Sequence, residues 1–133
     1  MKFSKEGDFQ RWCCHYLNIV NLDYFHVPNG IFSNPRSTTI MKRSGLKPGI
    51  PDLLVLNSND TYNGLAIELK IKSNKPSLHQ KYWLEKFLSH GWASVWLNNS
   101  EDFEILVSSY KKNLFAQKGF HFNHTKEGYI DGI

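Results

Sequence analysis

The sequence predicts a mixed α/β (α+β) fold in which one central β-sheet is flanked by helices. Segments with apolar residues at helical spacing alternate with short apolar runs of strand length, and strong turn formers separate two of those runs. The chain has 133 residues, of which 41% are hydrophobic and 14% aromatic. A chain of this length can bury roughly two thirds of its unfolded surface in one core. We therefore expect residues 1–133 to form a single domain.

The first third of the chain is expected to hold a helix, a strand and a short basic helix. Residues 5–18 carry apolar side chains at helical spacing, and Ser4 can cap the helix that they form. Tyr24 to Val27 form a short strand, and Pro28-Asn29-Gly30 suits a turn after it. Residues 36–44 form the basic helix, which later glycines and a proline interrupt. The apolar stripe of the first helix consists of Phe9, Trp12, Cys13, Tyr16 and Leu17.

The middle of the chain predicts a β-hairpin. Two apolar runs, from Asp52 to Leu56 and from Leu65 to Ile71, flank a stretch rich in Asn, Asp, Ser and Gly. These residue types favour turns, so the two runs should pair as antiparallel strands. Such pairing sets early residues of the first strand opposite late residues of the second.

A helix, a strand and a last helix are expected after the hairpin. Ser77 to His90 show helical spacing, and Gly91 stands where a left-handed C-cap belongs. Ala93 to Leu97 form a further strand, and Ser100 can cap the last helix. The buried stripe of that helix should consist of Phe103, Leu106, Val107 and Tyr110. Residues 114–133 carry less pattern, but they include apolar residues that should pack on the fold: Phe115, Phe120, Phe122, Tyr129 and Ile130.

The charge, the cysteines and the hydropathy of the chain indicate what kind of binding partner and which cellular compartment to expect. The net charge of +4 and the pI near 9.1 favour a polyanionic partner. Cys13 and Cys14 are adjacent in the first helix, so they cannot join distant segments, which favours a reducing, cytoplasmic environment. No stretch approaches ~18 uninterrupted apolar residues, so no membrane contact is expected.

Three ionisable residues interrupt the apolar hairpin and form the candidate chemical centre. Glu68 and Lys70 are two apart in the second strand, so they share a face, and the hairpin can bring Asp52 beside them. Two neighbouring carboxylates make a hard oxygen site suited to Mg²⁺. Lys70 can orient an attacking water or stabilise negative charge. On spacing alone, the alternative is an exposed strand face with an incidental ion pair.

Several motifs in a fixed order make the chain similar to a known family. Gly45-Leu46-Lys47-Pro48-Gly49-Ile50-Pro51-Asp52 is followed by Glu68-Leu69-Lys70, then by Gln80, and then by Gly91 before Val95-Trp96. Across about residues 5–100 this order resembles the virus-type replication-repair nuclease domain (VRR-NUC), a branch of the PD-(D/E)XK nuclease superfamily. The resemblance implies a restriction-endonuclease-like core, dependence on Mg²⁺ or Mn²⁺, and cleavage of DNA.

The resemblance also implies roles for individual residues. Asp52 and Glu68 would bind the metal, and Lys70 would act in catalysis. Glu6, followed four residues later by a glutamine, looks like the family's additional metal-binding acid. A first-turn acid that favours the helix dipole is the alternative for Glu6. Gln80 would support the catalytic site, and its alternative is the capping box that it can form with a serine three residues earlier.

The implied substrate is DNA, and basic residues bracket the centre on both sides. The expected phosphate contacts are Arg36, Lys42, Arg43, Lys47, Lys72 and Lys75. By resemblance we expect a small endonuclease of viral or prophage type that acts on branched or junction DNA as a homodimer. The alternatives are a catalytically silent nucleic-acid-binding module and a sequence-specific or RNA-directed nuclease.

Overall fold

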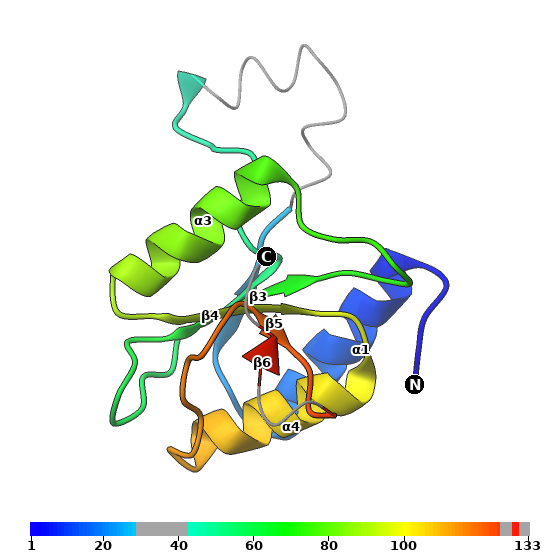
Figure 1. Cartoon of the computed structure of the whole chain (residues 1–133), viewed down its shortest axis with the longest axis vertical. Coiled ribbons are helices and arrows are strands. Elements are labelled where there is room, and N and C mark those ends of the chain that lie inside the picture. The colour runs from blue at the N-terminus through cyan, green and yellow to red at the C-terminus, as the bar shows by residue number, and fades with distance from the viewer. Residues whose placement is uncertain (29–42, 126–128, 131–133) are drawn as a thin grey trace.

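The computed structural model describes residues 1–28, 43–125 and 129–130, the last pair without their side chains. Figure 1 shows a sheet with helices on both sides. The helices are α1 (Glu6–Ile19), α3 (Leu78–Ser89) and α4 (Ser100–Lys111). The strands are β1 (Tyr24–His26), β2 (Leu53–Val55), β3 (Leu65–Leu69), β4 (Ala93–Leu97), β5 (His121–Phe122) and β6 (Tyr129–Ile130).

The six strands form one mixed sheet in the order β1-β2-β3-β4-β5-β6. The pairs β1–β2, β2–β3 and β5–β6 are antiparallel, whereas β3–β4 and β4–β5 are parallel. The predicted hairpin is therefore β2–β3, and its strands are one or two residues shorter at their ends than the apolar runs. The predicted fold class, a mixed central sheet flanked by helices, is confirmed.

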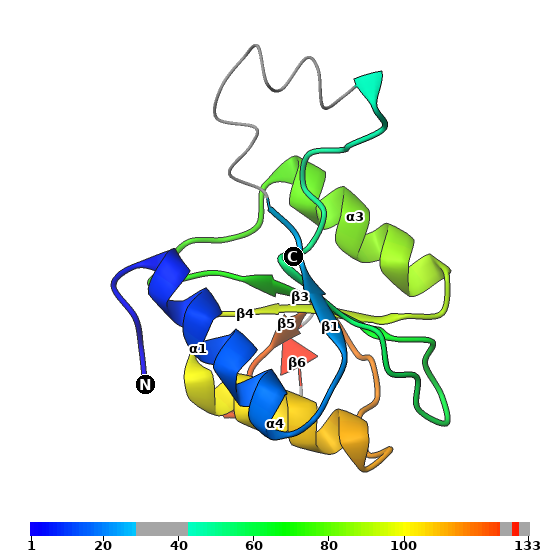
Figure 2. The ribbon, with the colours of Figure 1, turned by 180° about the vertical axis from the view of Figure 1, so that it is seen from behind.

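The two faces of the sheet are covered unequally. Figures 1 and 2 show α1 and α4 on one face and α3 on the other. The main core lies on the α1 and α4 side, where Phe9, Leu17, Ile67 and Phe103 are all fully buried in one cluster. On the other side, α3 fully buries one of its own residues, Leu84. The α3 side of the sheet is therefore thinly packed.

Two predicted helix caps are wrong. The N-cap of α1 is Lys5, which makes no side-chain cap hydrogen bond, so Ser4 does not cap this helix. The ring of Phe3 stacks on that of Phe9 at 5.1 Å and holds the entering chain through apolar contact instead. The N-cap of α4 is Asn99, whose side chain accepts a hydrogen bond from the backbone of the third helical residue. Ser100 is the first helical residue, and its hydroxyl donates to the carbonyl of Met1.

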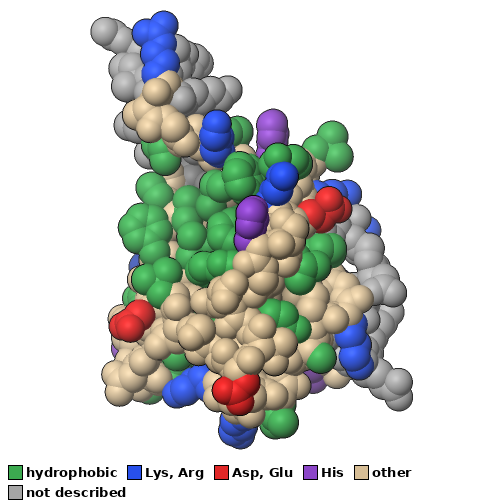
Figure 3. Space-filling view, turned by 90° about the vertical axis from the view of Figure 1, so that its left-hand side faces the viewer, with side chains coloured by type: hydrophobic (Ala, Val, Ile, Leu, Met, Phe, Trp, Pro, Cys, Tyr) green, Lys and Arg blue, Asp and Glu red, His purple; other side chains and the backbone are tan. Residues whose placement is uncertain are grey.

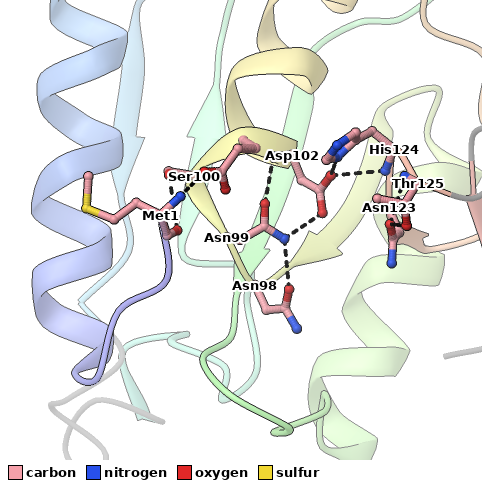
Figure 4. A network of polar contacts seen from close by, with 9 residues as sticks. Met1, Asn98, Asn99, Ser100, Asp102, Asn123, His124 and Thr125 are labelled. Atoms are coloured by element: carbon pink, nitrogen blue, oxygen red, sulfur yellow. Dashed lines mark hydrogen bonds and ion pairs between the residues drawn. The ribbon is translucent and has the colours of Figure 1, made fainter.

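Two aromatic residues of the less patterned C-terminal segment pack on the fold, as predicted. Phe115 and Phe122 are buried in the main core, and β5 and β6 extend the sheet beyond β4. Figure 4 shows a polar network that ties this segment to the start of α4. Asp102 accepts hydrogen bonds from the backbone and the ring of His124 and, at 2.7 Å, from Asn99.

Some expectations fall outside the described residues. Most of the predicted basic helix over residues 36–44 lies there, as does the turn after Pro28. Within the described part of the chain, no helix is long and apolar enough to span a membrane. The two cysteines are free thiols.

Candidate active site

The β2–β3 hairpin sets two carboxylates side by side. Leu53 pairs with Ile67, so Asp52, one residue before β2, comes opposite Glu68. The Asp52 side chain accepts a hydrogen bond of 2.8 Å from the backbone N–H of Leu69. Both acids are nearly inaccessible, with 5% of Asp52 and 0% of Glu68 exposed. The expected proximity of the two acids is therefore present in the fold.

Glu68 contacts two further residues of the expected site. The Lys70 ammonium lies 3.6 Å from Glu68 Oε2, and the Gln80 side-chain amide donates a 3.1 Å hydrogen bond to the same oxygen. The second oxygen, Glu68 Oε1, is buried and has no hydrogen-bond partner. A buried carboxylate oxygen without a partner is costly unless something positively charged or hydrogen-bonding reaches it. This oxygen fits a cation as its missing partner.

The surroundings of Glu68 disfavour its charge. Burial raises the pKa of Glu68 well above its ordinary value, and the nearby Asp52 carboxylate raises it further by repulsion. The Lys70 ammonium acts in the opposite direction, and Glu6 adds a smaller increase. Repulsion between buried acids is the condition that a divalent cation relieves.

Glu6 lies near this pair from the first turn of α1. Glu6 is solvent-exposed overall, but partial burial of its carboxyl group raises the pKa of that group. The nearby Asp52 carboxylate also raises the pKa, whereas the Lys70 ammonium lowers it. Among the described residues, no three side chains of His, Cys, Asp or Glu form a group that could hold a metal ion. Mg²⁺ needs one or two protein carboxylates and takes its other ligands from water and phosphate. The Asp52–Glu68 pair fits that requirement by itself.

Gln80 makes both of the contacts that the sequence left as alternatives. Its side-chain oxygen accepts a 2.8 Å hydrogen bond from the Ser77 backbone, and its own backbone N–H donates to the Ser77 hydroxyl, which completes a capping box. Its side-chain nitrogen donates to Glu68. The capping contact fixes the Gln80 amide through its oxygen, and the nitrogen of the same amide holds Glu68. The start of α3 is thereby linked to Glu68.

The described basic candidates are all solvent-exposed. Arg36 and Lys42 lie outside the described residues, whereas Arg43, Lys47, Lys72 and Lys75 are exposed. The chain between Lys47 and Asp52 passes tightly over the start of α3. A Cβ at Gly49 would meet the backbone of His79 at 2.6 Å, and Gly49 itself has φ +90. Only a glycine suits this approach.

Main-chain groups hold Asp52 in ways that sequence reasoning missed. The Leu69 N–H binds its carboxylate, and the Val27 N–H donates at 2.8 Å to its carbonyl, which ties β1 to the site. Every residue except proline carries a backbone N–H, so no side-chain signal could have revealed these contacts.

Comparisons with known proteins agree with this geometry. The model of the VRR-NUC domain matches residues 10–100.

The chain belongs to the VRR-NUC family.

VRR-NUC domains are nucleases, and the matched span contains Asp52, Glu68, Lys70 and Gln80 but not Glu6. A solved structure described as a VRR_NUC domain protein is similar in fold, with a TM-score of 0.59 and 24% sequence identity. That similarity covers 74% of this chain and 70% of the other. No curated protein matches the chain.

Proposed function

We propose that this VRR-NUC domain is a Mg²⁺- or Mn²⁺-dependent endodeoxyribonuclease that cleaves branched or junction DNA in replication and repair. The observation that carries this proposal is the buried Asp52–Glu68 pair with Glu68 Oε1 unpartnered and Lys70 alongside. A bound divalent cation supplies Lewis acidity to a phosphoryl oxygen and lowers the pKa of an attacking water.

Each side chain has a defined part in this proposal. Asp52 and Glu68 hold the cation, with Asp52 oriented by the Leu69 N–H and Glu68 by the Gln80 amide. Glu6 adds negative charge from the start of α1. Lys70 is a compact positive charge next to Glu68 and would stabilise the phosphate as its charge increases.

The basic residues serve as phosphate contacts in this proposal. Such contacts position DNA without reading its sequence. They are Arg36, Lys42, Arg43, Lys47, Lys72 and Lys75. A preference for DNA structure over base sequence agrees with a set of contacts made only of lysine and arginine.

Two copies of the chain would act together in the proposed enzyme. The described fold offers one Asp52–Glu68 pair, which suffices to cut one strand at a time. A homodimer would carry two such sites and make paired nicks in a branched substrate. Sedimentation with and without a four-way junction tests this step.

Cleavage of a labelled four-way junction tests the enzymatic proposal. We expect cleavage with Mg²⁺ or Mn²⁺ and none in EDTA. Asp52→Ala, Glu68→Ala and Lys70→Ala should each lower the rate by ~100-fold or more with the fold retained, because each removes charge stabilisation at the reacting phosphate. Glu104→Ala and Lys112→Ala, which change exposed residues of the α4 region, are the matched controls.

The outcomes separate the alternatives. Junction binding without cleavage in either metal would contradict the nuclease proposal and indicate a silent binding module. Flap, duplex and RNA substrates compared at one salt concentration would reveal a sequence-specific or RNA-directed enzyme. Unchanged cleavage by the Asp52 and Glu68 variants would show that these two acids do not form the catalytic site.

A further inference from the structure

One flank of α3 carries aromatic rings that the fold leaves partly open. The aromatic flank consists of Trp83, Phe87 and Trp92, with Lys86 and His90 beside them. These five residues line a hollow of about 240 Å³. All three rings are half-buried, while Lys86 and His90 are exposed. Figure 3 shows hydrophobic side chains gathered on the face that includes the end of α3, with cationic and histidine side chains next to them.

The rings of the aromatic flank form a continuous series. The centroids of Trp83 and Phe87 are 6.5 Å apart, and those of Phe87 and Trp92 are 5.3 Å apart. Trp92 is fixed against the sheet, because a Cβ at Gly64 would lie 2.4 Å from its ring. Asn63 ties the loop before β3 to the same corner by donating a hydrogen bond of 2.9 Å to the His90 carbonyl. The hollow is therefore bordered by the end of α3 and by the loop before β3, which contact each other.

The charge around the aromatic flank suits an anionic ligand. None of its five residues is acidic, and Lys86 supplies a positive charge. The one acid of α3, Glu85, is two residues from Trp83 and from Phe87, so it points to a different side of the helix. Aromatic faces next to a cation are typical of surfaces that stack the bases of single-stranded nucleic acid.

The aromatic flank lies on the same side of α3 as Gln80, a residue of the candidate active site. Trp83 and Phe87 follow Gln80 by three and seven residues, a spacing that puts all three on one side of α3. They lie ~5 and ~10 Å along the helix from Gln80, given a rise of about 1.5 Å per residue. Stacked bases are about 3.4 Å apart, so the flank spans a few nucleotides on one side of a phosphate that a cation at the Asp52–Glu68 pair would bind.

We propose that the aromatic flank binds unpaired bases of the DNA strand next to the scissile phosphate. This inference rests on the proposed function and specifies its substrate: DNA with a short single-stranded segment beside the cut. Bases stack on Trp83 and Phe87, and Lys86 contacts the backbone of the same strand. Stacking is indifferent to base identity, so the flank selects unpaired structure and not sequence.

Anisotropy of a labelled oligothymidylate of about ten nucleotides tests this binding. The titration is done in EDTA, so it needs no cleavage. We expect Trp83→Ala to weaken binding roughly tenfold and Trp83→Phe to stay near wild type, since a phenyl ring still stacks. Lys86→Gln should reduce the salt dependence of binding, whereas Lys112→Gln, an equal change of charge just after α4, should not. Melting temperatures of all variants verify folding.

Two results would overturn the inference. One is wild-type affinity of Trp83→Ala for the oligothymidylate. The other is a wild-type dimer that Trp83→Ala converts to monomers without loss of DNA affinity, which would assign the flank to a second copy of the chain. If the wild-type protein bound the oligothymidylate but did not cleave the junction, the result would contradict the proposed function and not the binding of unpaired bases by the aromatic flank.

Discussion

Glu68 is an acid in a position that disfavours its negative charge. It is fully buried, faces Asp52 across the hairpin, and keeps one oxygen without a partner. Burial and Asp52 together outweigh the opposing effect of Lys70, because the pKa of Glu68 is raised overall. The metal-free fold therefore carries a local cost that a proton or a cation relieves.

We expect Glu68→Gln to stabilise the metal-free protein at neutral pH while abolishing cleavage. Since the folded-state pKa is raised, the folded chain binds more protons than the unfolded chain above the ordinary value of 4.5. Stability should fall as the pH rises through that window, and the glutamine should remove much of the fall. Thermal melts in EDTA across this range should show a gain on the order of a few degrees at neutral pH.

Exposed Glu104→Gln serves as the control, because its side chain lies on the surface of α4. A Glu68→Gln variant that melts below wild type at neutral pH would show that the Lys70 contact outweighs burial and the repulsion from Asp52.

Metal should stabilise the wild-type fold through the same pair. We expect Mn²⁺ to raise the melting temperature of wild type but not of Asp52→Ala, with a gain of about 2.7 kcal/mol when free metal exceeds its Kd by 100-fold. The gain should shrink as the pH falls, because protons compete for the carboxylates. Equal stabilisation of both proteins would place the bound metal elsewhere.

At the scale of elements, α3 links helix capping to the candidate site. The amide of Gln80 caps the helix with its oxygen and holds Glu68 with its nitrogen. The two contacts fix one side chain from both ends, so the start of α3 sets the orientation of Glu68.

Two substitutions should separate these contacts. Ser77→Ala removes the cap, so we expect a loss of about 1 kcal/mol in the free energy of unfolding with most of the cleavage retained. Gln80→Glu keeps a residue that can complete the capping box but sets a second negative charge against Glu68. Its stability in EDTA should fall at least as far as that of Ser77→Ala, because a carboxylate then replaces the amide that donates to buried Glu68, and its cleavage should be far lower. The opposite ranking in cleavage would show that the cap, not the amide donor, matters to the site.

The elements differ in how far the sequence predicts them. The hairpin that pairs Asp52 with Glu68 follows from alternation and turn residues, and the capping box at Ser77 follows from spacing. The cap of α4 is Asn99 and not the adjacent Ser100, because both residue types can cap and only the folded chain selects between them. The N-cap of α1 is Lys5, whose residue type gives no capping signal, so the sequence favoured Ser4. The two-residue strand β5 is too short to show a period.

At the scale of the molecule, the C-terminal segment completes the main core. Phe115 and Phe122 are buried with residues of α1, β3 and α4, and Gln117 binds the backbone of Ser94 in β4 through both ends of its amide. The sequence predicts that these aromatic residues pack, but not where, because their partners are far away along the chain.

We expect Phe122→Ala to lower the free energy of unfolding by about 3–5 kcal/mol, the usual cost of removing a buried phenyl ring. Phe25→Ala is the matched control, since 56% of Phe25 is exposed on β1. Denaturant unfolding of both variants measures the difference. Similar losses for the two would show that the C-terminal segment contributes little to the core.

The parallel pairing of β4 with β5 bears on aggregation. All five residues of β4 are buried, and the Trp96 N–H donates at 2.8 Å to the Phe120 carbonyl of the C-terminal segment. A chain in which this segment has detached presents this apolar strand with an open edge. Other copies could then add to that edge, so the Asp102–His124 contact, which holds the segment in place, also protects the folded protein against self-association.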